Sequence, residues 1–347
     1  MTTGEALRIA KEWAVEQAKQ TPGTFGVFFG GSINSFLLEA AFPQSSDIDI
    51  FFVVDESVLP QLRQRKLCVE GLVLEPSYHP LGQFKSPEKV LGDFINAYNL
   101  SFNSVIYDPT GELSRTQRTV AEGYPLLKWV LKRKENILLS LNDFIHQIST
   151  DGSIFGRVWA LLWTANHIHQ LPLVALLRPP TVKKAIILFH DLCIDWLRES
   201  LYSSYLELLG SSTLTESELE APVKAFTRAY DFAVSVHRTP FFPDFILSKV
   251  SRPYMIGGVT DMIQSGYHKD SILWLLYGWT TALMAIQNDA PASFIEYEPP
   301  YDAFLASLLL KSQWDFGRKA QMARKVVEHV EQFADALIAS NPRILRK

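Results

Sequence analysis

Residues 25–54 read FGVFFGGSINSFLLEAAFPQSSDIDIFFVV, and this stretch decides the fold prediction. The apolar run at 25–29 predicts a short buried strand that ends at the glycine pair following it. Residues 45–54 predict a second strand, because they begin polar and finish in β-branched and aromatic side chains. Between the two strands, residues 33–42 have apolar side chains at helical spacing. The stretch therefore predicts a strand, a helix and a second strand.

The flanking sequence continues this alternation of helices and strands. Before it, Leu7, Ala10, Ala14 and Ala18 share one helical face, and Pro22-Gly23 ends that helix. After it we expect a helix from Asp55 or Ser57 to about Lys66, a strand at 72–75 ended by Pro76, and a strand at 104–107 followed by a turn. Such alternation is typical of an α/β domain.

After about residue 124 the pattern becomes helical. Helices are predicted at 126–148, 154–170, 182–209, 216–236, 271–287 and 301–339, the last in two pieces, with proline clusters at 178–180 and 291–300 as breaks. The fold class is therefore α+β. We expect a small α/β domain with a mixed sheet at 1–120 and an all-helical domain at 121–347.

Composition excludes several classes of protein. The chain has 347 residues, 47% of them apolar and 20% charged, which excludes wholesale disorder. A net charge of −4 argues against a protein that coats nucleic acid, and two cysteines cannot build a disulfide framework. There is no signal-peptide run, and the apolar segment 272–286 is too short for a bilayer. We expect a cytoplasmic protein without a membrane partner; its oligomeric state stays open.

Gly30, Gly31 and Ser32 stand where the first strand gives way to the next element. A helix start offers unpaired backbone N–H groups and a favourable dipole for an anion such as phosphate. Glycine lets the backbone approach the ligand closely, and the Ser32 hydroxyl can add a hydrogen bond. These three residues are the candidate nucleotide-binding turn.

Asp47 and Asp49 lie two residues apart on a strand, so their side chains share one face of it. Two carboxylates this close repel each other unless a cation lies between them. Oxygen ligands of this kind suit Mg²⁺ or Mn²⁺ held jointly with phosphates. Glu75, on a later strand, is the expected third carboxylate, and Glu70 is a weaker candidate for that place. Three carboxylates can hold two metal ions for displacement at phosphorus.

Together these motifs resemble the nucleotidyltransferases of the DNA polymerase β superfamily. The matching segments are Phe29-Gly30-Gly31-Ser32, the Asp-x-Asp strand 46–51 and Leu74-Glu75, and 107–113 is similar to the end of the family's minimal domain. They cover about the first third of the chain. The layout, a small domain before a helical one, resembles bacterial antibiotic nucleotidyltransferases that modify aminoglycosides or lincosamides.

The resemblance implies that a substrate hydroxyl attacks the α-phosphorus of a nucleotide, with ATP the expected donor, and that pyrophosphate leaves. Asp47, Asp49 and Glu75 would be the catalytic and metal-binding residues, and Glu75 or an acid of the helical domain would be the general base. The acceptor would be a small-molecule hydroxyl bound by the helical domain. Lys183 and Lys184, at the start of a predicted helix, are candidates to contact the triphosphate.

Two alternatives stay open at this point. Ile33-Asn34-Ser35 stands where an Arg- or Gly-rich turn is common in such enzymes. This difference suggests a catalytically weak or inactive protein of the same fold that binds nucleotide and has a regulatory role. The other alternative is an enzyme that nucleotidylylates a protein or an RNA end, although the acidic net charge weighs against RNA.

Overall fold

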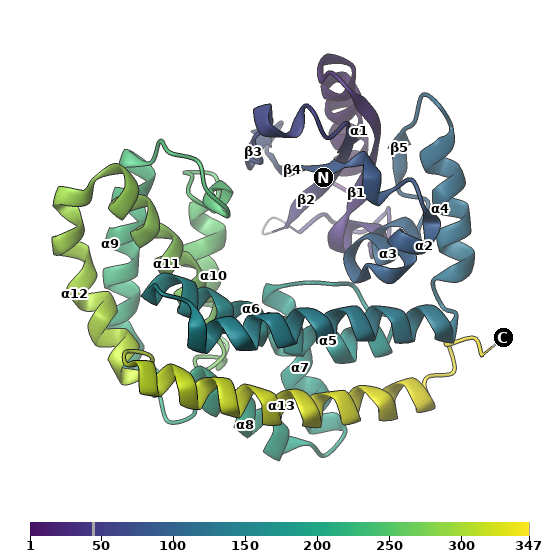
Figure 1. Ribbon diagram of the computed structural model, residues 1–347. Coiled ribbons are helices and arrows are strands. Elements are labelled where there is room, and N and C mark those ends of the chain that lie inside the picture. Colours follow the sequence, from purple (N-terminus) through teal and green to yellow (C-terminus); the bar gives the residue numbers. More distant parts are fainter. Residues whose placement is uncertain (44–45, 347) are drawn as a thin grey trace. The chain divides into compact units, whose positions relative to one another are not determined.

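The computed structural model describes residues 1–43 and 46–346, and only the backbone of Lys183 and Lys184. The chain forms two compact units, whose elements are labelled in Figure 1. The sheet unit consists of Met1–Asn136, Leu173–Thr181 and Ile338–Lys347; the helical unit consists of Ile137–Pro172 and Val182–Leu337. Ser45, in the expected second strand, lies outside the described residues. The assignment of nucleotide binding to 1–120 and of acceptor binding to 121–347 stays a prediction.

The sheet unit begins with the predicted first helix, α1 (Thr3–Gln20). A capping box starts it: the Thr2 hydroxyl accepts a hydrogen bond from the Glu5 N–H, and the Glu5 carboxylate accepts one from the Thr2 N–H. Ala6, Ala10, Ala14 and Ala18 are buried along one face of α1. Small side chains on that face allow the helix to lie close to the sheet.

A five-stranded mixed sheet follows, in the order β3-β4-β2-β1-β5. The strands are β1 (Thr24–Gly30), β2 (Asp47–Val54), β3 (Leu67–Val69), β4 (Leu72–Pro80) and β5 (Val105–Tyr107). β2 runs parallel to β4 and antiparallel to β1, while β3 and β5 form antiparallel edges. The α+β class with an N-terminal mixed sheet is therefore confirmed.

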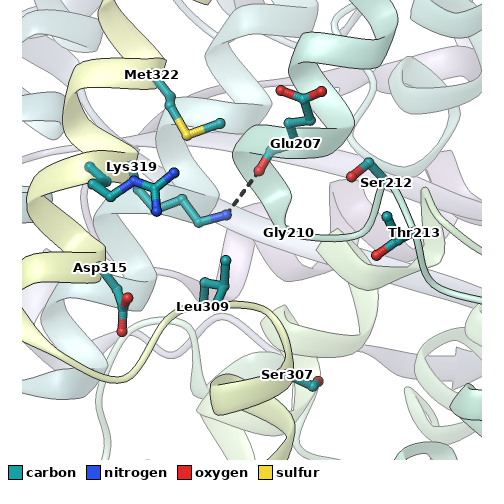
Figure 2. A pocket seen from close by; sticks show the side chains of 10 residues that line it. Glu207, Gly210, Ser212, Thr213, Ser307, Leu309, Asp315, Lys319 and Met322 are labelled. Carbon is teal, nitrogen blue, oxygen red and sulfur yellow. Dashed lines mark hydrogen bonds between the residues drawn. The ribbon is translucent and has the colours of Figure 1, made fainter.

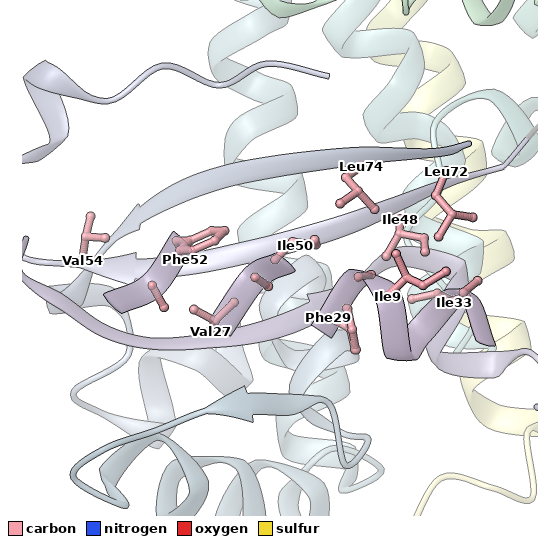
Figure 3. Close-up of a cluster of buried hydrophobic side chains, with 14 residues drawn as sticks. Ile9, Val27, Phe29, Ile33, Ile48, Ile50, Phe52, Val54, Leu72 and Leu74 are labelled. Atoms are coloured by element: carbon pink, nitrogen blue, oxygen red, sulfur yellow. The ribbon is translucent and has the colours of Figure 1, made fainter. Parts of the chain in front are cut away.

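Each face of the sheet carries its own apolar core. On one face, Ile48, Ile50, Phe52 and Val54 of β2 pack with α1 and with Leu72 and Leu74 of β4, as Figure 3 shows. On the other face, Phe28 and Val53 pack with helices that follow the sheet: α2 (Pro87–Gly92), α3 (Phe94–Leu100) and α4 (Glu112–Gly123). Successive side chains of a strand alternate between the faces, so one strand supplies both cores.

Two helices expected in this unit are wrong. In place of a helix at 33–42 there is a short 3₁₀ turn, Gly31–Ser35, because polar side chains bond to nearby carbonyls instead: Asn34 donates to Phe29 O and Ser35 to Ser32 O. In place of a helix at 55–66 there is a single 3₁₀ turn, Leu59–Gln61. Its proline, Pro60, has no N–H to donate and disfavours helical backbone in the residue before it.

The strand at 72–75 is confirmed, but its expected end at Pro76 is wrong. β4 continues to Pro80, and Pro76 pairs in register with Ile50 of β2. β3 pairs only with Leu72–Leu74, so Pro76 lies beyond the part of β4 that has a second neighbour. Proline is tolerated where one side of a strand is open, because no ladder partner needs its missing N–H there.

The remaining helices follow the predicted pattern with three differences. They are α5 (Leu127–Thr150), α6 (Ile154–Ala175), α7 (Lys183–Asp195), α8 (Glu199–Leu209), α9 (Glu220–Val236), α10 (Gly258–Gln264), α11 (Ser271–Asp289), α12 (Pro291–Ser307) and α13 (Gln313–Ser340). The helix expected at 182–209 is two helices, and α10 was not expected.

The third difference is at 291–300, where a break was expected. Pro291 instead begins α12, a position where its missing N–H costs nothing, and Pro299 and Pro300 lie inside the helix. Tyr301, Phe304 and Leu305 beside them are buried, so packing holds this segment helical. No helix in the described ranges has the length and apolar character needed to cross a membrane.

Truncation of a β2 side chain tests the apolar core between the sheet and α1. Ile50 is fully buried, and Ile50→Ala should lower the free energy of unfolding of the sheet unit by about 2–5 kcal/mol, because a cavity replaces packed atoms. Urea unfolding followed by hydrogen exchange in peptides from 24–54 measures this loss. Ile95→Ala, at a side chain that is 39% exposed, is the control and should cost about 1 kcal/mol or less. Equal losses would contradict the assignment of Ile50 to the core.

Candidate functional site

The pairing of β2 with β4 brings the three predicted carboxylates to one face of the sheet. Asp49 is in register with Glu75, and Asp47 lies two residues earlier on the same face of β2. The residues that alternate with them, Ile48 and Leu74, are buried in the core beneath α1. The acids therefore lie on the opposite face, at the end of β2 that the second apolar core leaves uncovered.

The three acids interact electrostatically. Burial, and then the negative charges of Glu75 and Asp47, raise the pKa of Asp49 well above its ordinary value. Burial also raises the pKa of Glu75, with Asp47 adding to the rise and Lys66 opposing it. Shifted pKa values of this kind, caused by burial and by neighbouring carboxylates, mark a candidate functional site.

Lys66 is the cation that the structure brings to these acids, and the sequence did not single it out. Its side chain is only 3% exposed, and its ammonium pairs with Asp47 Oδ2 and, at 2.6 Å, with Glu75 Oε2. Gln64, two residues earlier, donates to Glu75 Oε1 at 3.1 Å. Residues 62–66 belong to neither helix nor strand, and Arg63 and Arg65, which alternate with these two residues, are exposed. The only sequence signal was this local run of basic residues before β3.

The glycine turn lies directly against the carboxylates. A Cβ on Gly31 would collide with the Asp49 carboxylate, and a Cβ on Gly30 would collide with the Phe51 ring. Gly31 also has a φ of +68°, a backbone conformation that other residues adopt at a cost. Glycine is therefore favoured at position 31 by its positive φ and by the closeness of the Asp49 carboxylate, which a side chain would have to displace.

The turn is anchored from a distance. Asn99, a buried residue of α3, accepts the Gly31 N–H at 3.0 Å through its side-chain oxygen. A helix start was expected here to offer unpaired N–H groups; a 3₁₀ turn replaces that helix, and Asn99 accepts the Gly31 N–H. Ser32 lies in the same turn, and its carbonyl accepts the Ser35 hydroxyl. Asn99 could not be found from the sequence, since 68 residues separate it from Gly31.

Of the other candidates, Glu70 does not join this group. Glu70 is exposed at the turn between β3 and β4, with a φ of 49°. Lys183 and Lys184 begin α7 in the helical unit, and their side chains lie outside the described residues.

Two polar residues of β4 were not anticipated. Ser77 and His79 follow Glu75 on the same face of β4, and the Ser77 hydroxyl is 3.0 Å from His79 Nε2. His79 packs against the Phe51 ring, with centroids 4.7 Å apart, and burial lowers its pKa to about 4. His79 is therefore a neutral hydrogen-bonding group at pH 7. Strand alternation from Glu75 onward could have placed both residues on this face, had β4 not been expected to end at Pro76.

The donor chemistry of the acids suits a hard divalent ion, since carboxylate oxygens are the ligands that Mg²⁺ and Mn²⁺ prefer. Within residues 1–43 and 46–346, however, no three His, Cys, Asp or Glu side chains are arranged to hold one metal ion. The Lys66 ammonium lies between Asp47 and Glu75 instead. The residues therefore fit a divalent ion by the chemistry of their oxygen atoms, while the arrangement described here pairs two of them with Lys66.

A separate pocket of 270 Å³ lies within the helical unit, lined by residues of α8, α12, α13 and the loop after α8 (Figure 2). Lys319 of α13 is buried beside it and donates to the Glu207 carbonyl at 2.9 Å. Burial lowers the pKa of Lys319 to about 8. None of the residues proposed from the sequence line this pocket.

Comparison with known proteins assigns no family. No protein-family model matches the chain, and no curated protein matches its sequence. The site is therefore interpreted from its own residues.

Substitution of two of the glycines with positive φ, Gly71 and Gly31, separates backbone strain from collision. Gly71 has a φ of +82° and no atom within 4 Å of an added Cβ, so Gly71→Ala should cost only about 1–2 kcal/mol of stability from strain. Gly31→Ala adds the collision with Asp49 and should cost distinctly more. Thermal unfolding of both variants measures the difference. A smaller loss for Gly31→Ala than for Gly71→Ala would contradict the close approach of the turn to Asp49.

The raised pKa of Asp49 predicts a pH-dependent stability. A carboxyl whose folded pKa is raised contributes stability that is present at low pH and is lost as the pH rises through the folded pKa. Asp49→Asn removes this loss, so in EDTA it should raise the unfolding temperature at pH 8, with the gain shrinking toward pH 4. Glu39→Gln, at an exposed acid, is the charge-matched control. A gain for Asp49→Asn that is the same at both pH values would rule out this origin.

Proposed function

We propose that this protein is a metal-dependent nucleotidyltransferase that transfers a nucleoside monophosphate, with AMP from ATP as the first expectation, to a hydroxyl of a small molecule. The observation that carries the proposal is the register of β2 with β4, which gathers Asp47, Asp49 and Glu75 on one face beside the turn at Gly30 and Gly31. Carboxylates and a close backbone turn are the groups that this chemistry needs.

The excess of negative charge supports the metal part of the proposal. Asp49 and Glu75 both have raised pKa values, so ionising them in the folded protein is unfavourable until positive charge is added. Asp47, Asp49 and Glu75 would hold the divalent ions. When bound, such ions neutralise phosphate oxygens and stabilise charge that develops at the attacked phosphorus.

The chain's own groups would then orient the reaction. Gly30 and Gly31 let the backbone of the turn lie directly against Phe51 and Asp49, and the Ser32 hydroxyl can donate to a phosphate oxygen. The acceptor hydroxyl forms a bond to the α-phosphorus, the bond to the β-phosphate oxygen breaks, and pyrophosphate leaves. Glu75, in register with Asp49 on the neighbouring strand, is the proposed base for the hydroxyl proton.

Two observations favour a second candidate, a nucleotide-binding regulatory protein with little or no turnover. Asn99 already takes the Gly31 N–H, which removes one donor from a phosphate, and Lys66 already pairs with two of the three acids. In that case the same turn and acids would bind nucleotide without transfer. A protein- or RNA-directed transferase has no such observation in its favour.

Turnover separates the two functions. The wild-type protein with labelled ATP, Mg²⁺ and a panel of hydroxyl-bearing acceptors, aminoglycosides and lincosamides among them, should release pyrophosphate above background. Asp47→Asn, Asp49→Asn and Glu75→Gln should each lower that rate by at least about 100-fold, because each removes charge from the reacting centre. Glu70→Gln should leave the rate within about twofold, since Glu70 lies outside the group.

Nucleotide binding without pyrophosphate release from any acceptor would favour the regulatory candidate. Pyrophosphate release that survives all three substitutions would contradict the assignment of these acids to catalysis.

A further inference from the structure

The position of Lys66 carries an inference that rests on the proposed function and goes beyond it. Its side chain is 3% exposed, whereas those of Asp47 and Glu75 are 23% and 14% exposed, so Lys66 has the most deeply buried side chain of these ion pairs. A buried charge persists only when it is well paired, and here two carboxylates pair with it. Lys66 is therefore an integral part of the group.

Lys66 and a divalent ion need the same oxygens. A charge-assisted hydrogen bond places the ammonium nitrogen about 2.7–2.9 Å from a carboxylate oxygen, and Mg²⁺ lies about 2.0–2.1 Å from its ligands. Two cations held by Asp47 Oδ2 and Glu75 Oε2 together would lie within a few ångströms of each other and repel strongly. The ion pair and the metal complex therefore exclude each other at these two acids.

The segment that carries Lys66 would allow the ammonium to leave the carboxylates and a divalent ion to replace it. Residues 62–66 have no helix or strand, and Lys66 immediately precedes β3, a three-residue edge strand. The contacts of Lys66 with Asp47 and Glu75 are made through a long, flexible side chain, which can swing outward without moving β2 or β4. Gln64 can keep its hydrogen bond to Glu75 in either state.

We propose that Lys66 is a built-in counter-ion that competes with divalent metal ions for Asp47 and Glu75 and is released when the metal binds. In the metal-free protein the ammonium holds the two carboxylates together and offsets their repulsion. The apparent metal affinity is then the intrinsic affinity multiplied by the fraction of molecules in which Lys66 has left. The site is thereby regulated by the concentration of divalent ions.

Titration calorimetry with Mn²⁺ alone tests the competition without any activity measurement. Lys66→Met keeps an unbranched apolar side chain one atom shorter and removes the charge, so this variant should bind Mn²⁺ at least about tenfold more tightly than the wild type. Lys11→Met, at an exposed residue of α1, changes the net charge equally and should bind like the wild type. Affinity for Lys66→Met that equals or falls below that of the wild type would overturn the competition.

A second measurement uses the wild-type chain, so it holds even if Lys66→Met does not fold. Brief acylation with acetic anhydride, read by peptide mass spectrometry, should modify Lys66 slowly in EDTA and at least about fivefold faster in saturating Mn²⁺, because release exposes the amine. Lys11 is the internal control and should react equally in both. Unchanged protection of Lys66 in saturating Mn²⁺ would overturn its release.

The outcomes also separate this inference from the proposed function. Mn²⁺ that binds wild type and Lys66→Met with equal affinity overturns the competition and leaves the metal-dependent function standing. Absence of Mn²⁺ binding to both proteins at millimolar concentration overturns the metal-dependent function and the competition with it. Tighter binding to Lys66→Met that disappears when Asp47→Asn is added supports both.

Discussion

The site depends on repulsion between carboxylates that the sheet forces together. The parallel register of β2 with β4 places Asp47, Asp49 and Glu75 on the same face of the sheet. Their neighbours along the strands point to the other face, where they fill the core beneath α1: Ile48, Ile50 and Leu74. A register slip that separated the acids would expose that core to water. The apolar side of the sheet thus maintains an electrostatically unfavourable arrangement on its polar side, which the Lys66 ammonium partly offsets.

Two groups in the structure lie against the crowded carboxylates: Lys66 and the glycine turn. Lys66 supplies the positive charge from a segment without regular structure, and the glycine turn brings backbone against Asp49 where any side chain would collide. Asn99 holds that turn from α3 through a buried hydrogen bond. Sheet register, turn and ion pair are therefore parts of one arrangement, in which the stability of the sheet unit is linked to the charge state of its acids.

Much of this arrangement was predictable from the sequence, because alternation along a strand is a local property. The spacing of Asp47 and Asp49 and the apolar residues between and after them indicated both the strand and its polar face. The helix at 33–42 was wrong for a local reason too: Asn34 and Ser35 satisfy nearby carbonyls and disfavour the helix. Lys66 and Asn99 could not be predicted, since each acquires its role from a partner that only the folded sheet brings near. The predicted end of the strand at Pro76 was wrong because only the folded sheet shows that β4 has no neighbour on one side there.

The central claim is that the three acids hold divalent ions together with a nucleotide. Anomalous diffraction from crystals of the wild-type chain grown with Mn²⁺ and a non-hydrolysable ATP analogue tests it most directly. The account predicts manganese peaks bound by oxygens of Asp47, Asp49 and Glu75, with the Lys66 ammonium withdrawn from Asp47 and Glu75. Nucleotide bound elsewhere, or manganese absent from these acids while Lys66 remains paired with them, would contradict it.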